Sequence, residues 1–238
     1  MKKILIIIPA YNESESIEKV VDNLIQNYPQ YDYLIVNDCS TDNTEEIIQK
    51  RGYNYISLPV NLGIGGGVQS GYLYAVKNDY DIAIQMDGDG QHDPAYIEKL
   101  ITPIISGKAD ITIGSRFIDK TGFQTSFMRR LGINIISLVI RMCCGVKITD
   151  TTSGFRASNS EANKFFSQNY AQDYPEPEAI VAASLNGFKI QEVAVEMNER
   201  MGGISSINAK RSVYYMIKVS LALIICRIGI KKRRSNKR

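Results

Sequence analysis

Short apolar runs alternate with stretches of helical periodicity along the first half of this 238-residue chain. Repeated β-α-β units of this kind form a doubly wound, mostly parallel sheet with helices on both faces, an α/β fold. The expected strands are 4–9, 33–36, 55–59, 82–86 and 111–114, and the expected helices are 14–28, 42–50, 69–78 and 94–106.

The pattern is less regular beyond about residue 120. Helices are expected near 127–144, 158–167 and 177–186, and a strand at 190–195. We expect one domain over residues 1–205, followed by a membrane-associating helix and basic tail over residues 206–238.

Two carboxylates, Asp87 and Asp89, stand directly after the apolar run 82–86. Open α/β sheets bind ligands at the carboxyl ends of their strands. Mg²⁺ and Mn²⁺ take one or two carboxylates and fill their other positions with water and phosphate oxygens, so this D-x-D predicts a metal-bound diphosphate. A solvated acidic turn is the plain alternative. A calcium loop is excluded because His92 replaces the required glycine.

Polar residues also follow the first two expected strands. Asp38 can accept a hydrogen bond from a nucleotide base, and Tyr11 can lie against its ring. Asp42 is better explained as a helix cap. The glycine-rich stretch 61–67 contains no G-x-G-x-x-G and predicts close approach of the backbone, at Gly65, to a bound nucleotide.

Composition excludes several other classes of protein. His92 is the single histidine, so neither Ser-His-Asp catalysis nor a histidine-rich zinc site is expected. The four cysteines form no C-x-x-C pair and the first residues lack a signal-peptide pattern, so we expect a reduced, cytosolic setting. The net charge of +3 comes from the basic tail, and nucleic acid is not an expected partner.

Six motifs together resemble the inverting glycosyltransferases of family 2, which have the GT-A fold. They are PAYNE at 9–13, NDCSTDNT at 37–44, NLGIGGG at 61–67, DGDGQ at 87–91, GSR at 114–116 and TSGFR at 152–156. The similarity covers roughly residues 1–200 and extends to the polyprenyl-phosphate sugar transferases, including dolichol-phosphate mannose synthases. The second half is similar to bacterial cell-wall polysaccharide members that make a lipid-linked N-acetylglucosamine or a similar sugar.

The resemblance implies a role for each motif. A nucleoside diphosphate sugar would be bound by Pro9, Tyr11, Glu13, Asp38, Gly65 and Asp87. UDP is the expected nucleotide, with GDP and dTDP left open. Mg²⁺ or Mn²⁺ would be held by Asp87, Asp89 and Gln91. The acceptor phosphate would be bound by Arg116, Arg129, Arg130 and Arg200, and the catalytic residues would be Asp89, Arg116 and Glu178.

Two acceptors remain open. A polyprenyl phosphate such as undecaprenyl phosphate arrives ionised and needs cations, which Arg116 and Arg130 would supply. A sugar hydroxyl of a growing polysaccharide needs a general base, for which Glu178 or Glu176 is the candidate. Other hypotheses are a non-catalytic sugar-nucleotide-binding subunit and a nucleotidyltransferase, although the loop that the latter needs after its first strand is absent from the sequence.

The mostly apolar segment 213–230 contains Lys218 and Arg227. Each would cost about 2.5 to 3.5 kcal/mol near a bilayer centre, so a full span is not expected. We expect a helix at the membrane interface or on a small membrane-protein partner, with the tail on anionic lipid at the cytosolic face of the cell membrane. Residues 131–146 are expected to form either a second interfacial helix or an ordinary buried one.

Overall fold

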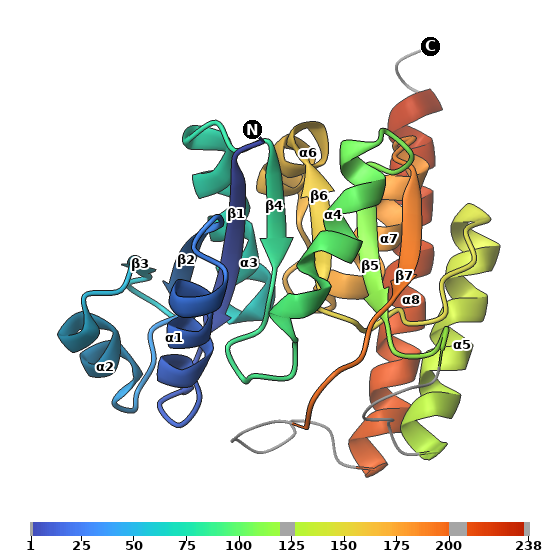
Figure 1. Cartoon of the computed structure of the whole chain (residues 1–238). Coiled ribbons are helices and arrows are strands. Elements are labelled where there is room, and N and C mark those ends of the chain that lie inside the picture. Colours follow the sequence, from blue (N-terminus) through green and yellow to red (C-terminus); the bar gives the residue numbers. More distant parts are fainter. Residues whose placement is uncertain (1, 120–126, 200–208, 236–238) are drawn as a thin grey trace.

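The computed structural model describes residues 2–119, 127–199 and 209–235, which form an α/β unit with helices on both faces of a sheet (Figure 1). The strands are β1 (Ile4–Ala10), β2 (Asp32–Asn37), β3 (Tyr55–Ser57), β4 (Ile82–Gln85), β5 (Ile111–Ser115), β6 (Arg156–Asn159) and β7 (Ile190–Ala194). The helices are α1 (Ile17–Asn27), α2 (Thr44–Arg51), α3 (Gly63–Lys77), α4 (Ile97–Ile105), α5 (Phe127–Cys144), α6 (Ser160–Asn169), α7 (Pro175–Leu185) and α8 (Ala209–Ser235), with the 3₁₀ turn η1 (Pro94–Tyr96) before α4.

The expected mostly parallel sheet is confirmed, with the strand order β3-β2-β1-β4-β6-β5-β7. Strand β1 lies between the parallel strands β2 and β4, so the loops after these three strands meet at one edge of the sheet. Alternate side chains of β1 point to opposite faces. Ile6 and Ile8 pack with α1, α2 and α4, whereas Leu5 and Ile7 pack with α3, α6 and α7. Helices therefore pack against both faces of the sheet beside the edge where these loops meet.

One strand differs from the sequence-based expectation. Residues 158 and 159, expected to begin a helix, belong to β6, which runs antiparallel to both β4 and β5. Helix α6 begins only at Ser160, because the side chain of Asn159 accepts the N–H of Ala162 and caps it. Strand β6 brings the TSGFR motif to the end of β4, beside the D-x-D.

The start of α3 also differs from expectation. The helix begins at Gly63 and not near residue 69, so the glycine-rich stretch forms its first turns. A Cβ on Gly71 would lie 2.2 Å from Cγ2 of Ile7 in β1. The glycine thus permits a close packing of α3 on the sheet that any side chain would prevent.

Gly71→Ala is expected to lower the free energy of unfolding by about 1 to 3 kcal/mol, because the new methyl group overpacks the contact with Ile7. The measurement is urea unfolding. Gly229→Ala in α8 is the matched control, since a Cβ there would meet nothing within 4 Å and should be neutral or stabilising. Equal unfolding midpoints for the two variants would contradict the close contact.

The C-terminal helix α8 packs on the body of the protein. Val219 and Leu223 are buried against α5 and α7, in a cluster that includes Ile136 and Ile140. Helix α5 is thus buried along one side, and its other side is exposed. In the described parts of the chain, no helix has the length and apolar character needed to cross a bilayer. The expected boundary at residues 205 and 206 lies outside the described residues.

Candidate functional site

A pocket of about 720 Å³ opens at the carboxyl ends of β1, β2 and β4. Of the residues expected to bind a nucleotide sugar, those that line it are Pro9, Tyr11, Glu13, Asp38 and Asp87. Asp89 joins them from the same turn as Asp87. The structure therefore brings the strand-end residues into one site, which we call the donor pocket.

The loops after β1 and β2 are bonded to each other. Asn12 and Cys39 both have left-handed backbone conformations, with φ of 57° and 58°, which turn the chain away from the sheet. Oδ1 of Asn12 accepts the N–H of Thr41 at 2.8 Å. The ring of Tyr11 is 47% exposed and lines the pocket, where it can lie against a base. Sequence reasoning missed Asn12, although Asn is the residue that most often tolerates this conformation.

Asp38 is almost fully buried at the floor of these loops. Its Oδ1 accepts the N–H of Leu62 at 2.7 Å, and its backbone carbonyl accepts a hydrogen bond from Asn61. The carboxylate therefore orders the start of α3 as well as lining the pocket. Asp42 accepts the N–H of Thr44, the first residue of α2, but the N-cap position itself is Asn43, one residue later than the sequence predicted.

Gly65 does not lie where the sequence placed it. A Cβ on Gly65 would lie 2.2 Å from the carbonyl oxygen of Ala171, so this glycine packs on the loop before α7. Gly63 and Gly67 line the donor pocket instead. A helix turns by about 100° per residue, so neighbouring glycines of α3 face different directions. The sequence did not reveal that the helix starts at Gly63, so it did not show which glycines would face the pocket.

The D-x-D turn can hold a hard cation. Asp89 is 2% exposed, and its Oδ1 accepts the backbone N–H of Gln91 at 3.0 Å. The carbonyl of Gln91 accepts the N–H of Asn198. Within the described residues no cluster of three or more His, Cys, Asp or Glu side chains is present. The carboxylates of Asp87 and Asp89 are the oxygen ligands that Mg²⁺ and Mn²⁺ take, with water and phosphate oxygens completing the shell.

His92 lies directly behind this turn. Its Nδ1 accepts the backbone N–H of Asp87 at 2.9 Å, and its ring stacks on Phe155 of the TSGFR motif. Burial lowers the pKa of His92 to about 4, although the nearby charge of Asp89 opposes this shift. The imidazole is therefore neutral near pH 7.

Arg116 is buried and forms a bidentate ion pair. Its Nε and one terminal nitrogen lie 2.7 and 2.8 Å from the two carboxylate oxygens of Asp150. Glu192 in turn accepts the backbone N–H of Asp150 at 2.8 Å. The guanidinium expected to bind an acceptor phosphate thus forms an ion pair with Asp150, which lies 34 positions further along the chain.

The two arginines at the start of α5 are placed differently. The guanidinium of Arg130 lies 3.6 Å from the ring centroid of Phe117 and donates to the carbonyl of Thr149. Arg129 is exposed. Arg200, the fourth expected phosphate ligand, lies outside the described residues.

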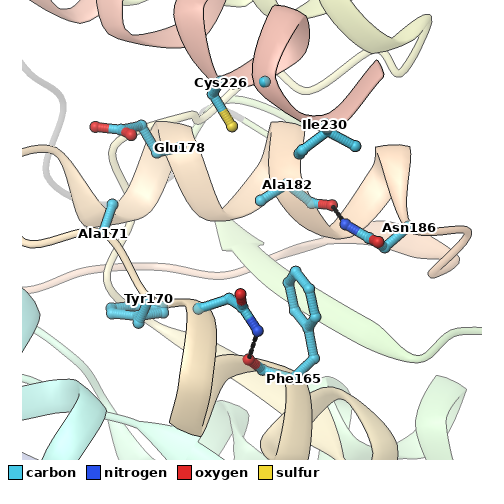
Figure 2. Close-up of a pocket in the computed structure, with 10 residues that line it drawn as sticks. Phe165, Tyr170, Ala171, Glu178, Ala182, Asn186, Cys226 and Ile230 are labelled. Atoms are coloured by element: carbon cyan, nitrogen blue, oxygen red, sulfur yellow. Dashed lines mark hydrogen bonds between the residues drawn. The ribbon is translucent and has the colours of Figure 1, made fainter. Parts of the chain in front are cut away.

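The two glutamates of α7 occupy different pockets. Glu176 lines the donor pocket, and burial raises its pKa, with Arg156 opposing the shift. Glu178 lies in a second pocket of about 620 Å³ between α6, α7 and α8, near Tyr170 and Cys226 (Figure 2). Residues two apart on a helix point about 200° apart, so only one of the pair can reach the donor pocket. Glu178, expected to be catalytic, is the one that faces away from it.

A mostly parallel sheet with a carboxylate pair in a pocket at the carboxyl ends of its strands is the arrangement in which open α/β enzymes bind their ligands. The sequence model of glycosyl transferase family 2 matches residues 5–166. The chain belongs to this family and is a glycosyltransferase.

Named relatives are similar over most of the chain. A UDP-N-acetylglucosamine–dolichyl-phosphate N-acetylglucosaminyltransferase of Methanococcus voltae is 34% identical, over 82% of this chain and 85% of the relative. A polyprenol monophosphomannose synthase of Mycolicibacterium smegmatis is 27% identical, over 92% and 86%. Glucosyl-3-phosphoglycerate synthase from Mycobacterium tuberculosis, solved with Mn²⁺ and UDP-glucose, has a TM-score of 0.72 at 17% identity, over 96% and 80%. This structural likeness confirms the GT-A type of fold.

Proposed function

We propose that the enzyme transfers one sugar from a nucleoside diphosphate donor, UDP first, to a polyprenyl phosphate at the cytosolic face of the membrane, with Mg²⁺ or Mn²⁺. The observation that carries the proposal is the donor pocket, in which Asp87 and Asp89 stand beside the strand-end loops. The acceptor class is supported by relatives named for dolichyl, polyprenol and undecaprenyl phosphate.

Each part of the site has a task in this reaction. In this proposal Asp38, Tyr11, Gly63 and Gly67 hold the nucleotide, and Asp87 and Asp89 hold the metal from the lining of the pocket. Gln91 is the third proposed metal ligand, although it does not line the pocket. When bound, the metal acts as a Lewis acid toward the leaving diphosphate. The acceptor is already anionic, so it needs positive charge and no strong base. Arg129 and Arg130 supply that charge in our proposal. The Arg116–Asp150 pair supports Arg130 through the ring of Phe117, which both arginines contact.

The direct test is an assay of the full chain with undecaprenyl phosphate in lipid vesicles. Radiolabelled UDP-N-acetylglucosamine, UDP-glucose, GDP-mannose and dTDP-sugars are supplied separately with Mg²⁺ or Mn²⁺. Transfer of label into the organic-extractable lipid is the expected result. Label that appears only in a water-soluble saccharide acceptor would contradict the lipid phosphate acceptor.

Glu176 favours a second candidate, transfer to a sugar hydroxyl. Glu176 is half-buried in the donor pocket, where desolvation raises its pKa in the direction that a general base for a hydroxyl requires. With a lipid phosphate acceptor, Glu176→Gln should affect positioning alone and lower kcat by less than about tenfold. Removal of a true base costs about 10² to 10⁴ in rate, across the pH range. Steady-state kinetics with each acceptor decide between them, and Glu178→Gln in the second pocket is the matched control.

An apolar face on α5 and α8 supports the membrane location. Its exposed members follow helical spacing and are Leu131, Ile135, Leu138 and Met142 on α5, and Ile217, Leu221, Ile224, Ile225 and Ile228 on α8. The two helices pack side by side, and each carries its own exposed stripe (Figure 1). Such stripes bind in the headgroup region of a bilayer. A small membrane-protein partner would bind the same stripes. Binding to protein-free vesicles would show that the stripes bind lipid without such a partner.

The double variant Leu138→Glu, Ile225→Glu is expected to lower partitioning into anionic vesicles at least about 100-fold. These side chains are 57% and 67% exposed, and burying each in lipid contributes roughly 1.5 to 3 kcal/mol. The control is Leu73→Glu, Ile105→Glu, which changes exposed apolar residues of α3 and α4. Co-sedimentation measures the partitioning. Deletion of the C-terminal helix is a poorer probe, because Val219 and Leu223 belong to the core.

A further inference from the structure

Asp87 lies at the mouth of the donor pocket, and residues behind the pocket determine where its carboxylate stands. His92 fixes the backbone, since its Nδ1 accepts the N–H of Asp87 at 2.9 Å. A neutral imidazole that accepts at Nδ1 carries its proton on Nε2. Nε2 lies 3.7 Å from Oδ2 of Asp87, which is an electrostatic contact without a direct hydrogen bond.

The ring of His92 is itself held in place. It is 6% exposed and stacks on Phe155, with ring centroids 4.9 Å apart and planes 10° apart. The backbone of His92 forms an antiparallel bridge with Met197. The imidazole therefore has no freedom to follow a displaced Asp87, and it acts as a fixed support.

Gly154 lies against the carboxylate of Asp87. A Cβ at this position would lie 3.0 Å from both carboxylate oxygens of Asp87. The backbone of Gly154 does not have a positive φ, so its conformation allows alanine, whose Cβ would press on the Asp87 carboxylate and would also lie 3.1 Å from Nε2 of Gln85. Arg156 anchors the same turn by donating to the carbonyls of Ser153 and Glu176. The turn that carries Gly154 thus forms a floor beneath the carboxylate.

We propose that His92 and Gly154 are positioning residues that hold the Asp87 carboxylate in the geometry required to bind the metal–diphosphate group. The inference rests on the proposed function, because Asp87 needs this geometry only toward such a ligand. The inference also assigns a structural role to each of three residues of the TSGFR motif. Gly154 leaves room for the carboxylate, Phe155 supports His92, and Arg156 fixes the turn.

The test measures metal binding and nucleoside binding separately. Binding of Mn²⁺ to the full chain with UDP is followed by the EPR signal of free Mn²⁺, and binding of uridine, which lacks phosphates, is followed by NMR. His92→Phe keeps the stacked ring and removes the acceptor, and Gly154→Ala pushes on the carboxylate. Supporting residues of metal ligands typically contribute 10- to 100-fold in affinity, so each variant should weaken Mn²⁺ binding by about that factor. Uridine binding should not change.

His92→Asn is the conservative variant, because its side-chain oxygen can accept the N–H of Asp87 and should restore most of the Mn²⁺ affinity. Thermal unfolding verifies that each variant is folded. Wild-type Mn²⁺ affinity in Gly154→Ala and His92→Phe would overturn the inference. Equal losses for Mn²⁺ and uridine would also overturn it, since they indicate general damage to the pocket. A wild-type chain that binds no Mn²⁺ with UDP, GDP or dTDP would instead overturn the proposed function, and the inference with it.

Discussion

Asp89→Asn is expected to lower kcat at least about 100-fold and to leave the fold intact. The amide oxygen of Asn can still accept the N–H of Gln91, so the turn keeps its internal hydrogen bond. The lost group is the negative charge that a hard cation requires. A bound Lewis acid contributes several kcal/mol, and about 1.4 kcal/mol corresponds to tenfold in rate. Steady-state kinetics with Mn²⁺ varied, together with circular dichroism, measure both effects.

Asp93→Asn is the matched control for this prediction. It makes the same change of charge four positions away, and its side chain caps η1 by accepting the N–H of Ala95. Asn caps a helix about as well as Asp, so kcat should stay near that of the wild type. Full activity of Asp89→Asn, or of the wild type in EDTA, would show that the metal assignment is wrong.

Arg116→Ala is expected to reduce the free energy of unfolding by about 3 to 5 kcal/mol, because it leaves the Asp150 carboxylate buried without its cation. The urea midpoint should fall by at least about 1 M. Arg116→Met combined with Asp150→Asn removes both charges of the pair and should recover a large part of the loss. Urea unfolding of the wild type, Arg116→Met, Asp150→Asn and the combined variant gives the coupling energy, with Arg116→Ala measured beside them.

The same variants test the role that the sequence suggested for Arg116. If Arg116→Ala unfolds like the wild type and raises only the KM for undecaprenyl phosphate, Arg116 is a phosphate ligand and the ion pair is incidental. The expected contrast is with Arg129→Ala and Arg130→Ala. Those variants should raise the KM for the lipid phosphate, and a charge-assisted hydrogen bond contributes about 1.5 to 3 kcal/mol.

The fold was predictable wherever a segment carries its own periodic signal. The strand Ile4–Ala10 is buried throughout, and Ile17–Asn27 places its apolar residues on one side, so both were recognised as elements from the sequence. Strand β6 was not. Its segment Arg156–Asn159 has no alternation of polar and apolar residues, and it pairs with strands distant in sequence. Pairing of this kind is decided by tertiary contacts and not by local pattern.

The site residues also differ in whether the sequence alone predicts their positions. Tyr11, Asp38, Asp87 and Asp89 follow strands directly, so the parallel sheet alone brings them to one edge. Arg116 and Glu178 depend on something that the sequence does not display. The first depends on a buried partner, and the second depends on the rotation of α7 relative to the sheet. The strand-end residues could therefore be placed from the sequence, whereas the ion-pair partner of Arg116 and the direction of Glu178 could not.

The close packing of α3 on β1 has a consequence for changing the substrate of this enzyme. Gly71 against Ile7 locks the helix to the sheet, so Gly67 and Pro9 form one rigid wall of the donor pocket. Glu176 also lines this pocket, from the start of α7. The loop before α7 touches α3 where the backbone of Ala171 meets Gly65. Residues 171 and 172 pack on Gly65 as closely as Ile7 packs on Gly71, so they should be kept. We expect an engineer who wants a different sugar to succeed by redesigning residues 173–176, with the nucleotide-binding half left unchanged.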